Sequence, residues 1–430
     1  MNTKILKWFG IGAVILFILL CIWYFFFNKP TTTTTSGGAT TTTNTTITTG
    51  TGAFGAPAQT IVTIPVGTTG GGTTNVSQPV TQAGMSQGPT QKIFKIADGP
   101  VAGAIYIQTQ NPTTTVARYI MQDTGHVLDF PVDVPGAVAR SVSNTTIPGI
   151  QQILWTGQGT GAILNHLDGQ IIRTISIGLT SATSTITAGT PLIAHVTFLH
   201  DSMISAAISP DGKNIAYLLG TANGSDGYTA NIDGTNAKKI FSLPLSQVTV
   251  SWPTQTALMV QTKTGVGIPG IAFSIPIKTG VPAQLFYAPG LSAVANSTFT
   301  RVVYQTIDDG ATAGKTYSHD VVNGRDIALS HSPLPEKCTW SPNTATILYC
   351  AASITAMPAN YIDLWHMGLL SAIDGIFAFN LAIGQATALA VPGSVDGGVQ
   401  TDVASLAVSP NEKYILFISK KDRSLWGVRL

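Results

Sequence analysis

Several acidic and histidine side chains of the chain could bind a cation or transfer protons. They are Asp226, Asp308 and Asp309, together with the neighbouring pair His200 and Asp201. Hard cations prefer carboxylate ligands, and a carboxylate beside an imidazole or a second carboxylate is a common acid–base pair. The alternative is that they are turn residues and solvated charges, since matches this short often arise by chance.

A cluster of aromatic and polar residues lies in the segment NYIDLWHMGLL. Its members are Tyr361, Asp363, Trp365, His366 and Met367. Exposed aromatic rings with methionine and a few polar groups suit contact with a protein or a glycan. The alternative is a short helix folded onto the rim of the domain with its aromatic rings inward, which ordinary burial preferences favour.

Other motifs of catalysis are weak. Asp123-Thr124-Gly125 resembles the triplet of aspartic proteases, but it has no second copy and occupies a turn that recurs along the chain. There is no phosphate-binding loop and no H-E-x-x-H motif. No cofactor or metal is therefore predicted, and the sequence favours a role other than catalysis.

Cys338 and Cys350 flank a predicted hairpin symmetrically about Thr344. This placement predicts that they face each other across neighbouring strands. In an exported protein they could form a disulfide, although adjacent-strand geometry is strained. Two reduced thiols in the core are the alternative.

The element that must position these residues is most regular between Ile204 and Leu243. Apolar alternation runs into Ser209-Pro210-Asp211-Gly212, a tight turn in which Pro presets φ and Gly accepts a positive φ. A strand is predicted at 214–219, a long polar loop at 220–227 and a hairpin at Asp233-Gly234. The unit is therefore a four-stranded antiparallel sheet, which needs neighbours to bury its faces.

This unit recurs along the chain. An apolar second strand is predicted at 104–108, 152–155, 215–219, 257–260, 301–304, 347–350 and 415–419. A glycine-containing hairpin before each fourth strand is predicted at 123–125, 168–169, 233–234, 278–280, 323–324 and 383–384. The last copy ends after its third strand, Ser424 to Arg429, and Gln91 to Ile96 resembles the missing fourth strand. The prediction is an all-β, seven-bladed β-propeller closed by its N-terminal strand.

The phrase SPDGKNIAYL, with the weaker SPNEKYILF and SPNTATILY, resembles the TolB-like propeller repeats related to the WD-repeat superfamily. The resemblance covers about residues 91–430 and matches cleanly only at 204–243. It implies a propeller fold and little about function.

An uncharged stretch of about 20 residues, Trp8 to Phe27, precedes the repeats and is long enough to cross a bilayer once. Lys4 and Lys7 lie before it, and after Lys29 no charge occurs until Lys92. The positive-inside rule thus predicts a cytoplasmic N-terminus at 1–7, a transmembrane helix at 8–27 and an extracytoplasmic remainder, periplasmic or at the cell surface. A cleaved signal peptide is the alternative. The Thr-, Gly- and Ser-rich segment 28–90 is predicted to be a disordered linker, and 91–430 the propeller domain.

The predicted topology sorts the loops onto two faces. The connector face carries the links between blades and the loops between second and third strands, and the hairpin face carries the remaining hairpins. Long segments at 178–202, 220–227, 262–270, 307–315 and 351–373 are all predicted to lie on the connector face, where binding is expected.

Three functions fit this layout. The first is a membrane-tethered scaffold that binds a protein or glycan through the connector face. The second is an enzyme, a lyase or hydrolase acting on envelope polysaccharide at the channel mouth. The third is a structural component of a surface assembly. The net charge of +2 provides no basic field, so nucleic acid is not a predicted partner.

Overall fold

The computed structural model describes residues 91–109, 113–143, 145–181, 192–308, 314–358, 360–391 and 400–430. The chain divides into two compact units, Met1–Gln78 and Pro79–Leu430, and every described residue belongs to the second. The predicted cytoplasmic segment 1–7, transmembrane helix 8–27 and linker 28–90 thus lie outside the described residues. Among the residues that are described, no helix has the length and apolar character to cross a membrane.

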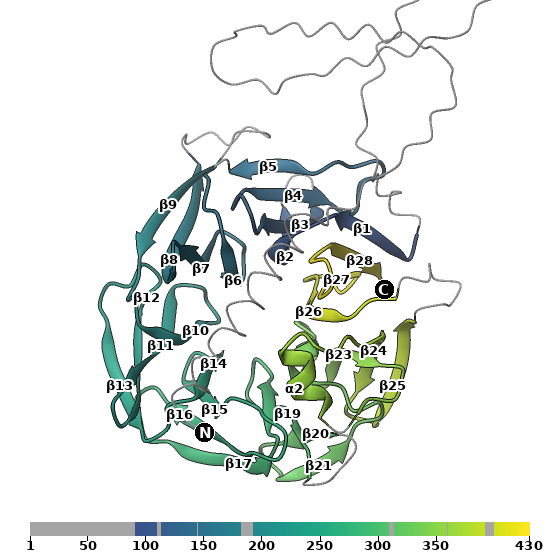
Figure 1. Cartoon of the computed structure of the whole chain (residues 1–430). Helices are drawn as coiled ribbons and strands as arrows, with labels where there is room; N and C mark the ends of the chain where they lie inside the picture. The colour runs from purple at the N-terminus through teal and green to yellow at the C-terminus, as the bar shows by residue number, and fades with distance from the viewer. Residues whose placement is uncertain are drawn as a thin grey trace, which may run out of the picture. The chain divides into compact units, whose positions relative to one another are not determined.

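The second unit contains seven four-stranded antiparallel sheets, each a blade (Figure 1). Blades one to three are β2 (Val101–Thr109), β3 (Thr114–Met121), β4 (Val127–Pro131), β5 (Arg140–Ser143); β6 (Ile150–Trp155), β7 (Gly161–Asp168), β8 (Ile171–Ser181), β9 (Leu192–Phe198); and β10 (Met203–Ile208), β11 (Asn214–Thr221), β12 (Gly224–Asn231), β13 (Lys238–Leu243). Blades four and five are β14 (Val248–Thr254), β15 (Ala257–Thr262), β16 (Pro269–Pro276), β17 (Ala283–Pro289); and β18 (Ser292–Ala295), β19 (Arg301–Thr306), β20 (Lys315–Asp320), β21 (Arg325–Ala328).

The last two blades contain the remaining elements. Blade six is β22 (Cys338–Trp340), β23 (Ile347–Ser353), β24 (Asp374–Asn380) and β25 (Gln385–Ala390), with the 3-10 helix η1 (Pro335–Lys337) before it and the helix α2 (Tyr361–His366) inside it. Blade seven is β26 (Val403–Val408), β27 (Tyr414–Ser419), β28 (Leu425–Arg429) and β1 (Ile93–Ala97). The seven-bladed propeller predicted from the repeats is confirmed.

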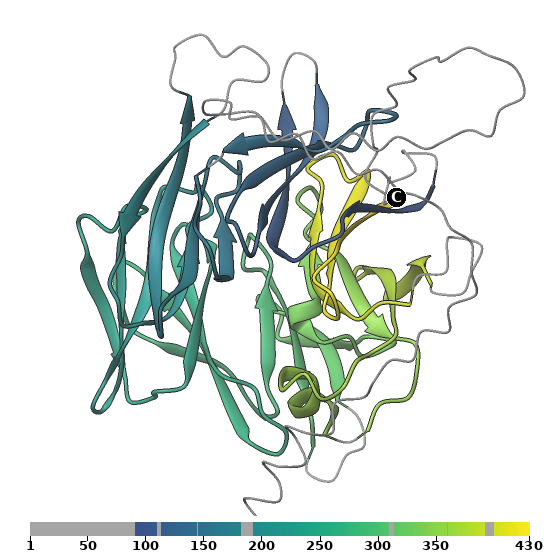
Figure 2. The same ribbon diagram turned by 45° about the horizontal axis from the view of Figure 1, so that its top comes forward.

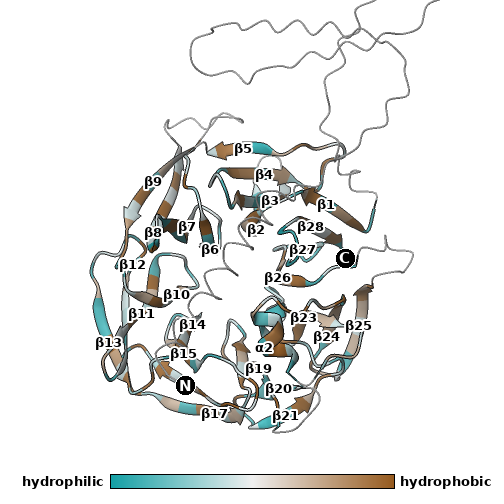
Figure 3. Cartoon of the chain, viewed as in Figure 1, coloured by the Kyte–Doolittle hydropathy of each residue, from teal (hydrophilic) through white to brown (hydrophobic). Residues whose placement is uncertain are grey.

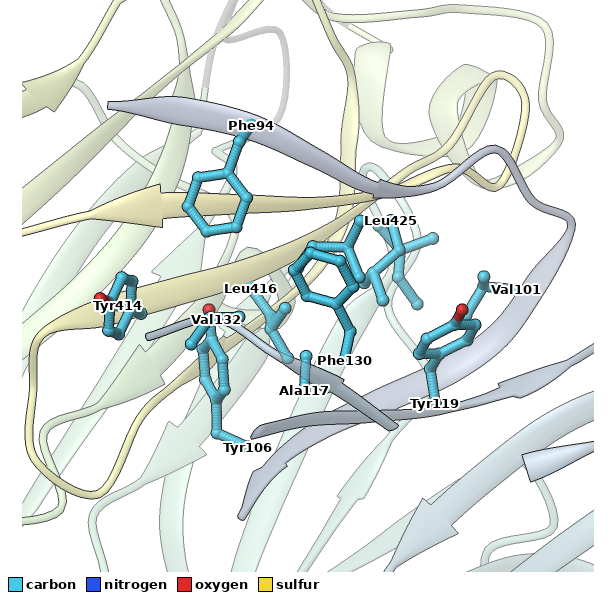
Figure 4. Close-up of a cluster of buried hydrophobic side chains, with 12 residues drawn as sticks. Phe94, Val101, Tyr106, Ala117, Tyr119, Phe130, Val132, Tyr414, Leu416 and Leu425 are labelled. Carbon is cyan, nitrogen blue, oxygen red and sulfur yellow. The ribbon is translucent and has the colours of Figure 1, made fainter. Parts of the chain in front are cut away.

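The ring closes as predicted, through the N-terminal strand. β1 pairs antiparallel with β28, with Ile93 opposite Val428 and Phe94 opposite Gly427. A Cβ on Gly427 would lie 2.4 Å from the Phe94 ring, so the glycine makes room for that ring. Phe94 also meets the Tyr414 ring edge-on at 6.4 Å in the cluster between blades seven and one (Figure 4). Both ends of the domain therefore contribute to one core, and the last sheet has no missing strand.

The hydrophobic core lies between adjacent blades rather than in the middle of the ring. Most clusters of buried side chains combine residues from neighbouring sheets, such as Leu218 of blade three with Leu258 of blade four. Figure 3 shows hydrophobic residues distributed through the strands of the blades, and the tilted view in Figure 2 shows the sheets side by side around the ring. Fully burying a side chain such as Leu218 stabilises the fold by roughly 1.5–3 kcal/mol.

The predicted strand order is correct in blades three to seven but shifted by one strand in blades one and two. Residues 104–108 and 152–155 lie in β2 and β6, which are first strands, not second strands. Pro148 precedes Trp155 by the same seven residues that separate Pro210 from Tyr217, and this spacing suggested a second strand at 152–155. Pro148 stands in the link before β6, however, whereas Pro210 stands in the first hairpin of its blade. Asp123–Gly125 and Asp168–Gly169 consequently join second to third strands, and both turns lie on the connector face.

Two predicted loops are also wrong. Residues 178–202 do not link blades two and three, because they include the end of β8 and all of β9; the gap between these strands is the last hairpin of blade two and belongs to the hairpin face. Residues 220–227 are mostly strand, since β11 ends at Thr221 and β12 begins at Gly224. Gly227 is a strand residue that admits the Phe241 ring, which a Cβ would approach to 2.1 Å. Glycine signals close packing here rather than a loop.

Candidate functional site

The longest described insertion on the connector face joins β23 to β24 and carries α2. In Figure 1 this helix lies beside β23. Its placement between the second and third strands of blade six confirms the loop predicted at 351–373. The segments after β15 and β19 are also second-to-third loops, as predicted. The connector face therefore carries long loops from blades four, five and six, which are neighbours in the ring.

The helix α2 buries its aromatic side chains. Tyr361 and Trp365 are four residues apart, so they share one face of the helix, and both are buried. With Ile362 they pack against Ile307 and Leu334 from blade five and the link that follows it. Gln305 Nε2 donates a hydrogen bond to Tyr361 Oη at 2.9 Å. Both rings therefore face inward, as in the alternative of a short helix with buried aromatic side chains. Burial raises the pKa of Tyr361 to about 12.

A buried charge network, formed by Lys337, Asp374, Asp402 and Trp365, lies beneath α2. Lys337 Nζ is 2.7 Å from Asp374 Oδ2 and 2.8 Å from Asp402 Oδ1, and its side chain is only 3% exposed. Trp365 Nε1 donates to Asp402 Oδ1 at 2.8 Å. The lysine also lies over the indole ring, 4.6 Å from its centroid. One cation thus joins η1, the first residue of β24 and the residue before β26.

Asp374 is the least satisfied member of the network. Its Oδ2 accepts from Lys337 Nζ and from Val403 N, the latter at 2.8 Å, but its Oδ1 is buried without a partner among the described residues. Burial raises the pKa of Asp374, and the charge of Lys337 opposes that rise. A buried carboxylate keeps its charge only when it is paired and hydrogen-bonded.

Lys420, from the loop between β27 and β28, adds a second cation to the helix. Its Nζ donates to the Trp365 carbonyl oxygen and lies 3.5 Å from the centroid of the indole ring. Burial lowers the pKa of Lys420. The C-terminal end of a helix is the end that favours a cation. Blade seven therefore holds the end of a helix that belongs to blade six.

The polar residues of α2 have local partners. His366 Nε2 is 2.7 Å from Glu336 Oε1, and this hydrogen bond raises the pKa of His366 against the opposing effect of burial. Asp363 Oδ1 accepts a hydrogen bond from Val266 N at 3.1 Å, which ties the loop after β15 to the helix. His366 and Met367 remain exposed at the surface. The predicted cluster is thus divided between an inner and an outer side.

A pocket of about 200 Å³ opens beside α2, between the link that follows β21 and the insertion of blade six. Its walls include Ala352, Met357, Leu370 and Trp365, and Lys337 and Asp374 also line it. His331 and Ser332 at its edge have φ of 62° and 37°. The pocket is mainly apolar, with one buried ion pair at its wall, which is the composition of many ligand sites.

The remaining predicted residues are engaged separately. Asp226 lies in β12 and pairs with Lys239 Nζ at 2.8 Å and with Ser242 Oγ at 2.7 Å. Asp201 pairs with Arg173 at 3.1 Å, and His200 Nδ1 accepts from Ser202 N at 3.2 Å.

Asp308 is exposed, and Asp309 lies outside the described residues. Within the described ranges no three His, Cys, Asp or Glu side chains are grouped so that they could hold a metal ion. The predicted carboxylates that are described therefore do not assemble into a cation site.

Sequence reasoning missed Lys337, Asp374 and Asp402. A signal existed, because Asp374 and Asp402 each stand just before a strongly apolar strand, in IDGIFAF and TDVASLAV. A carboxylate in that position is either exposed or paired with a buried cation. The shared cation, Lys337, is 37 residues from Asp374 and 65 residues from Asp402 in the sequence. Sequence periodicity does not relate residues so far apart.

Cys338 and Cys350 form a disulfide in the structure. They are opposite each other in the pairing of β22 with β23, as their spacing predicts. The bond fixes the innermost strand of blade six to its neighbour directly after η1, which carries Lys337. The covalent bond and the buried charge network therefore stabilise the same corner of the blade.

Comparison with protein-family models and with curated proteins finds no match. Among solved structures, an oligogalacturonate lyase in complex with manganese is 11% identical with a TM-score of 0.51, over 78% of this chain and 98% of the lyase. An oligogalacturonate lyase from Vibrio parahaemolyticus is 8% identical with a TM-score of 0.52, over 80% of this chain and 95% of the lyase.

TolB from Acinetobacter baumannii is 12% identical with a TM-score of 0.40, over 79% of this chain and 65% of TolB. That score is too low to carry an argument. Identities this low show a shared fold and nothing about chemistry. The chain is thus a seven-bladed β-propeller, the fold that its TolB-like and WD-like repeats predict, and its function has to be argued from its own surface.

Proposed function

We propose that the chain is a membrane-tethered, extracytoplasmic propeller that binds a protein partner through its connector face. The observation that carries the proposal is a group of aliphatic side chains standing out from firmly held loops. Met367 is 61% exposed, Leu369 72% and Ile268 61%. Exposed apolar side chains gathered on one face with polar neighbours are typical of protein interaction sites. These three residues are called the aliphatic patch below.

The patch spans two blades that are joined beneath it. Ile268 ends the loop after β15, and that loop donates from Val266 N to Asp363 of α2. Val266 also packs against the cluster that contains Tyr361. Loops fixed in this way lose little conformational entropy when a partner binds, which favours affinity.

A protein partner fits this face better than a glycan does. Sugar rings commonly stack on exposed aromatic side chains, whose flat faces are apolar. The two aromatic residues that the sequence offered for this purpose, Tyr361 and Trp365, are buried in the core of the insertion. What reaches the surface is aliphatic and sulfur-containing, and methionine is a frequent residue of adaptable protein-binding surfaces.

The disulfide supports the proposed compartment. Disulfides form and persist outside the cytoplasm and are rare in reducing compartments. The bond between Cys338 and Cys350 lies in the second unit, C-terminal to residues 8–27, and the charge pattern predicts that this part of the chain is extracytoplasmic. A retained helix at 8–27 with the linker at 28–90 would then tether the propeller to the membrane.

The enzymatic alternative receives no comparable support. It requires two of Asp308, Asp309, Asp201, His200 and His366 within hydrogen-bond reach of each other. Asp201 pairs with Arg173, His200 accepts from Ser202 N, and His366 pairs with Glu336. No hydrogen bond among the described residues joins two members of the set, so the binding function is the better supported one.

The proposal is tested by substituting the patch and capturing partners from intact membranes by crosslinking. The variants Met367→Asp and Leu369→Asp place a charge on the patch without touching the buried rings. Ile383→Asp is the matched control, because Ile383 is 63% exposed in the same blade but lies in the β24–β25 hairpin on the hairpin face. We expect a specific crosslinked protein to be lost in the first two variants and kept in the control.

Two other results would contradict the proposed function. Capture that survives both patch variants would exclude the connector face as the binding surface. A partner that stays bound in fixed stoichiometry through gel filtration would instead indicate a structural component of a surface assembly, because permanent interfaces are larger and more apolar than transient ones.

A further inference from the structure

A second pocket, of about 360 Å³, lies on the channel side of blades seven, one and two. It is lined by the first strands of these blades, β26, β2 and β6, which Figure 1 shows nearest the centre of the ring, and by residues of β27 and β28. Arg423, from the loop between β27 and β28, lines it as well. Loops between second and third strands belong to the connector face, so Arg423 lies at the connector-face end of this pocket.

The backbone holds Arg423 in place from both sides. Its guanidinium donates from Nε to the Val101 carbonyl oxygen at 3.1 Å and from a terminal nitrogen to the Ala102 carbonyl oxygen at 2.8 Å. Its own carbonyl oxygen accepts from Val101 N at 3.0 Å. Gly99 allows this approach, since a Cβ there would lie 2.7 Å from the Arg423 carbonyl. The guanidinium is therefore fixed between blade seven and blade one.

Among the described residues, no carboxylate pairs with this cation. Burial is what lowers the pKa of Arg423, with no acidic neighbour acting against it. The adjacent carboxylate, Asp422, accepts instead from Ser424 N and Oγ. A guanidinium carries five N–H groups, and among the described residues only two nitrogens of Arg423 have acceptors, both backbone carbonyls. The buried Arg118, by contrast, pairs with the Asp129 carboxylate at 2.8 Å.

The surroundings suit a carboxylate on a short carbon stem. Gln152 and Ser405 add polar groups to the pocket, while Ile153, Trp155 and Leu406 form partly exposed apolar walls. A sugar ring would bring hydroxyl groups on every side and require more polar partners than these. The stem of a glutamate, or the last residue of a polypeptide, meets the apolar walls and leaves its charge for the guanidinium.

We propose that this pocket is a carboxylate-binding site in which Arg423 receives an acidic side chain or the C-terminal carboxylate of the protein partner. The inference rests on the proposed function for the identity of the ligand. The free edge of the guanidinium pairs with both carboxylate oxygens, a geometry that lysine does not reproduce. The pocket then supplies specificity for one charged residue, while the aliphatic patch supplies apolar contact area.

The test uses small probes and the purified full chain in detergent micelles. The probes are acetyl-glutamate amide, its uncharged isostere acetyl-glutamine amide, and D-glucuronate as a sugar acid. Affinities are measured by ligand-observed saturation-transfer NMR. We expect acetyl-glutamate amide to bind in the millimolar range and at least about tenfold more tightly than the glutamine probe, because hydrogen bonds to charged groups are the stronger ones.

Three variants localise the binding. Arg423→Lys keeps the charge but loses the planar fork, so we expect a loss of about tenfold or more. Ser405→Glu places a competing carboxylate at an exposed position of the pocket, and Ser202→Glu places the same charge at an exposed connector-face residue that does not line the pocket. The first should abolish probe binding, and the second should leave it within about twofold, because a surface substitution away from the site has little effect.

Different results would contradict the site itself and the class of ligand assigned to it. Equal affinity for the glutamate and glutamine probes, no binding of either, or unchanged binding in Ser405→Glu would overturn the site. Tighter binding of D-glucuronate than of the glutamate probe would overturn its assignment to a polypeptide. None of these assays uses the partner, so loss of crosslinking in the Met367 variant with normal probe binding would leave this site intact.

Discussion

Blade three and blade six are the same four-stranded unit used in two ways. In blade three the loop between β11 and β12 is residues 222–223, and the acidic residue Asp226 pairs with Lys239 at the surface. In blade six the same connection runs over residues 354–373, and its charges are buried under α2. Local turn chemistry shapes blade three, whereas blade six depends on contacts with blades five and seven.

The comparison shows what a long insertion needs on a propeller. Residues 354–373 form only one short helix, α2, which has too few residues to be stable alone. Its fixed position comes from Tyr361 and Trp365, which are buried, and from Lys337, Asp402 and Lys420, which contact Trp365. An insertion held by such buried contacts can present a binding surface in a fixed position.

The largest expected effect comes from breaking the buried charge network. Lys337→Met leaves Asp374 and Asp402 buried without their cation, so we expect a loss of about 3–5 kcal/mol in the free energy of unfolding. Lys239→Met, which removes the cation of the exposed pair in blade three, should change stability little. Urea denaturation followed by tryptophan fluorescence measures both variants.

A triple variant sharpens the same contrast. Adding Asp374→Asn and Asp402→Asn to Lys337→Met removes every charge of the network, and most of the lost stability should return because no unpaired charge stays buried. A triple variant no more stable than Lys337→Met would show that packing, and not charge pairing, is what the lysine provides.

The disulfide gives the second largest effect. It closes a loop with a sequence separation of 12, and by chain entropy its removal should cost about 3 kcal/mol. We expect Cys338→Ala with Cys350→Ala to lower the thermal midpoint, and reductant to have no further effect on this variant. A wild-type midpoint that does not respond to full reduction, verified by thiol labelling, would contradict the expectation.

In blade three, by contrast, substitution of a turn glycine should lower the stability. Gly212 has φ of 72°, and the atom nearest to its missing Cβ is the Thr156 Cβ at 3.3 Å, so Gly212→Ala costs mainly the left-handed backbone, about 1–2 kcal/mol. Gly178→Ala is the control, because nothing lies within 4 Å of a Cβ there and its φ is not positive. Equal unfolding midpoints in urea for the two variants would show that the turn is not a determinant of the blade.

The smallest expected effect is a pH dependence at the outer side of α2. The hydrogen bond to Glu336 raises the pKa of His366 in the folded chain. The pair therefore contributes its full stabilisation of the folded state at pH values below the unfolded histidine pKa of about 6.5. The stabilisation is lost as pH rises through the higher folded pKa. We expect wild type to exceed His366→Gln by less than about 1 kcal/mol in mildly acidic urea denaturation, since the pair is partly exposed. The difference should vanish in alkaline buffer.

Much of the ring was predictable because its signals are local. The Ser209-Pro210-Asp211-Gly212 turn forms as expected, with Gly212 N donating to the Ser209 carbonyl oxygen at 2.8 Å. The candidate site was less predictable, because the sequence left open which way Tyr361 and Trp365 face, and the structure buries both. Lys337 and Arg423 gave no sequence signal, because each acts through a blade that is distant in the chain.

The sequence by itself determined the number of blades, the closing strand and the position of Cys338 opposite Cys350, because turns and apolar alternation act between neighbouring residues. Only the tertiary structure decided the first two blades' strand order, the inward face of α2 and the charges that meet beneath it. Those depend on which blades become neighbours when the ring closes, and the desolvation that makes Lys337 and Asp374 partners arises only then.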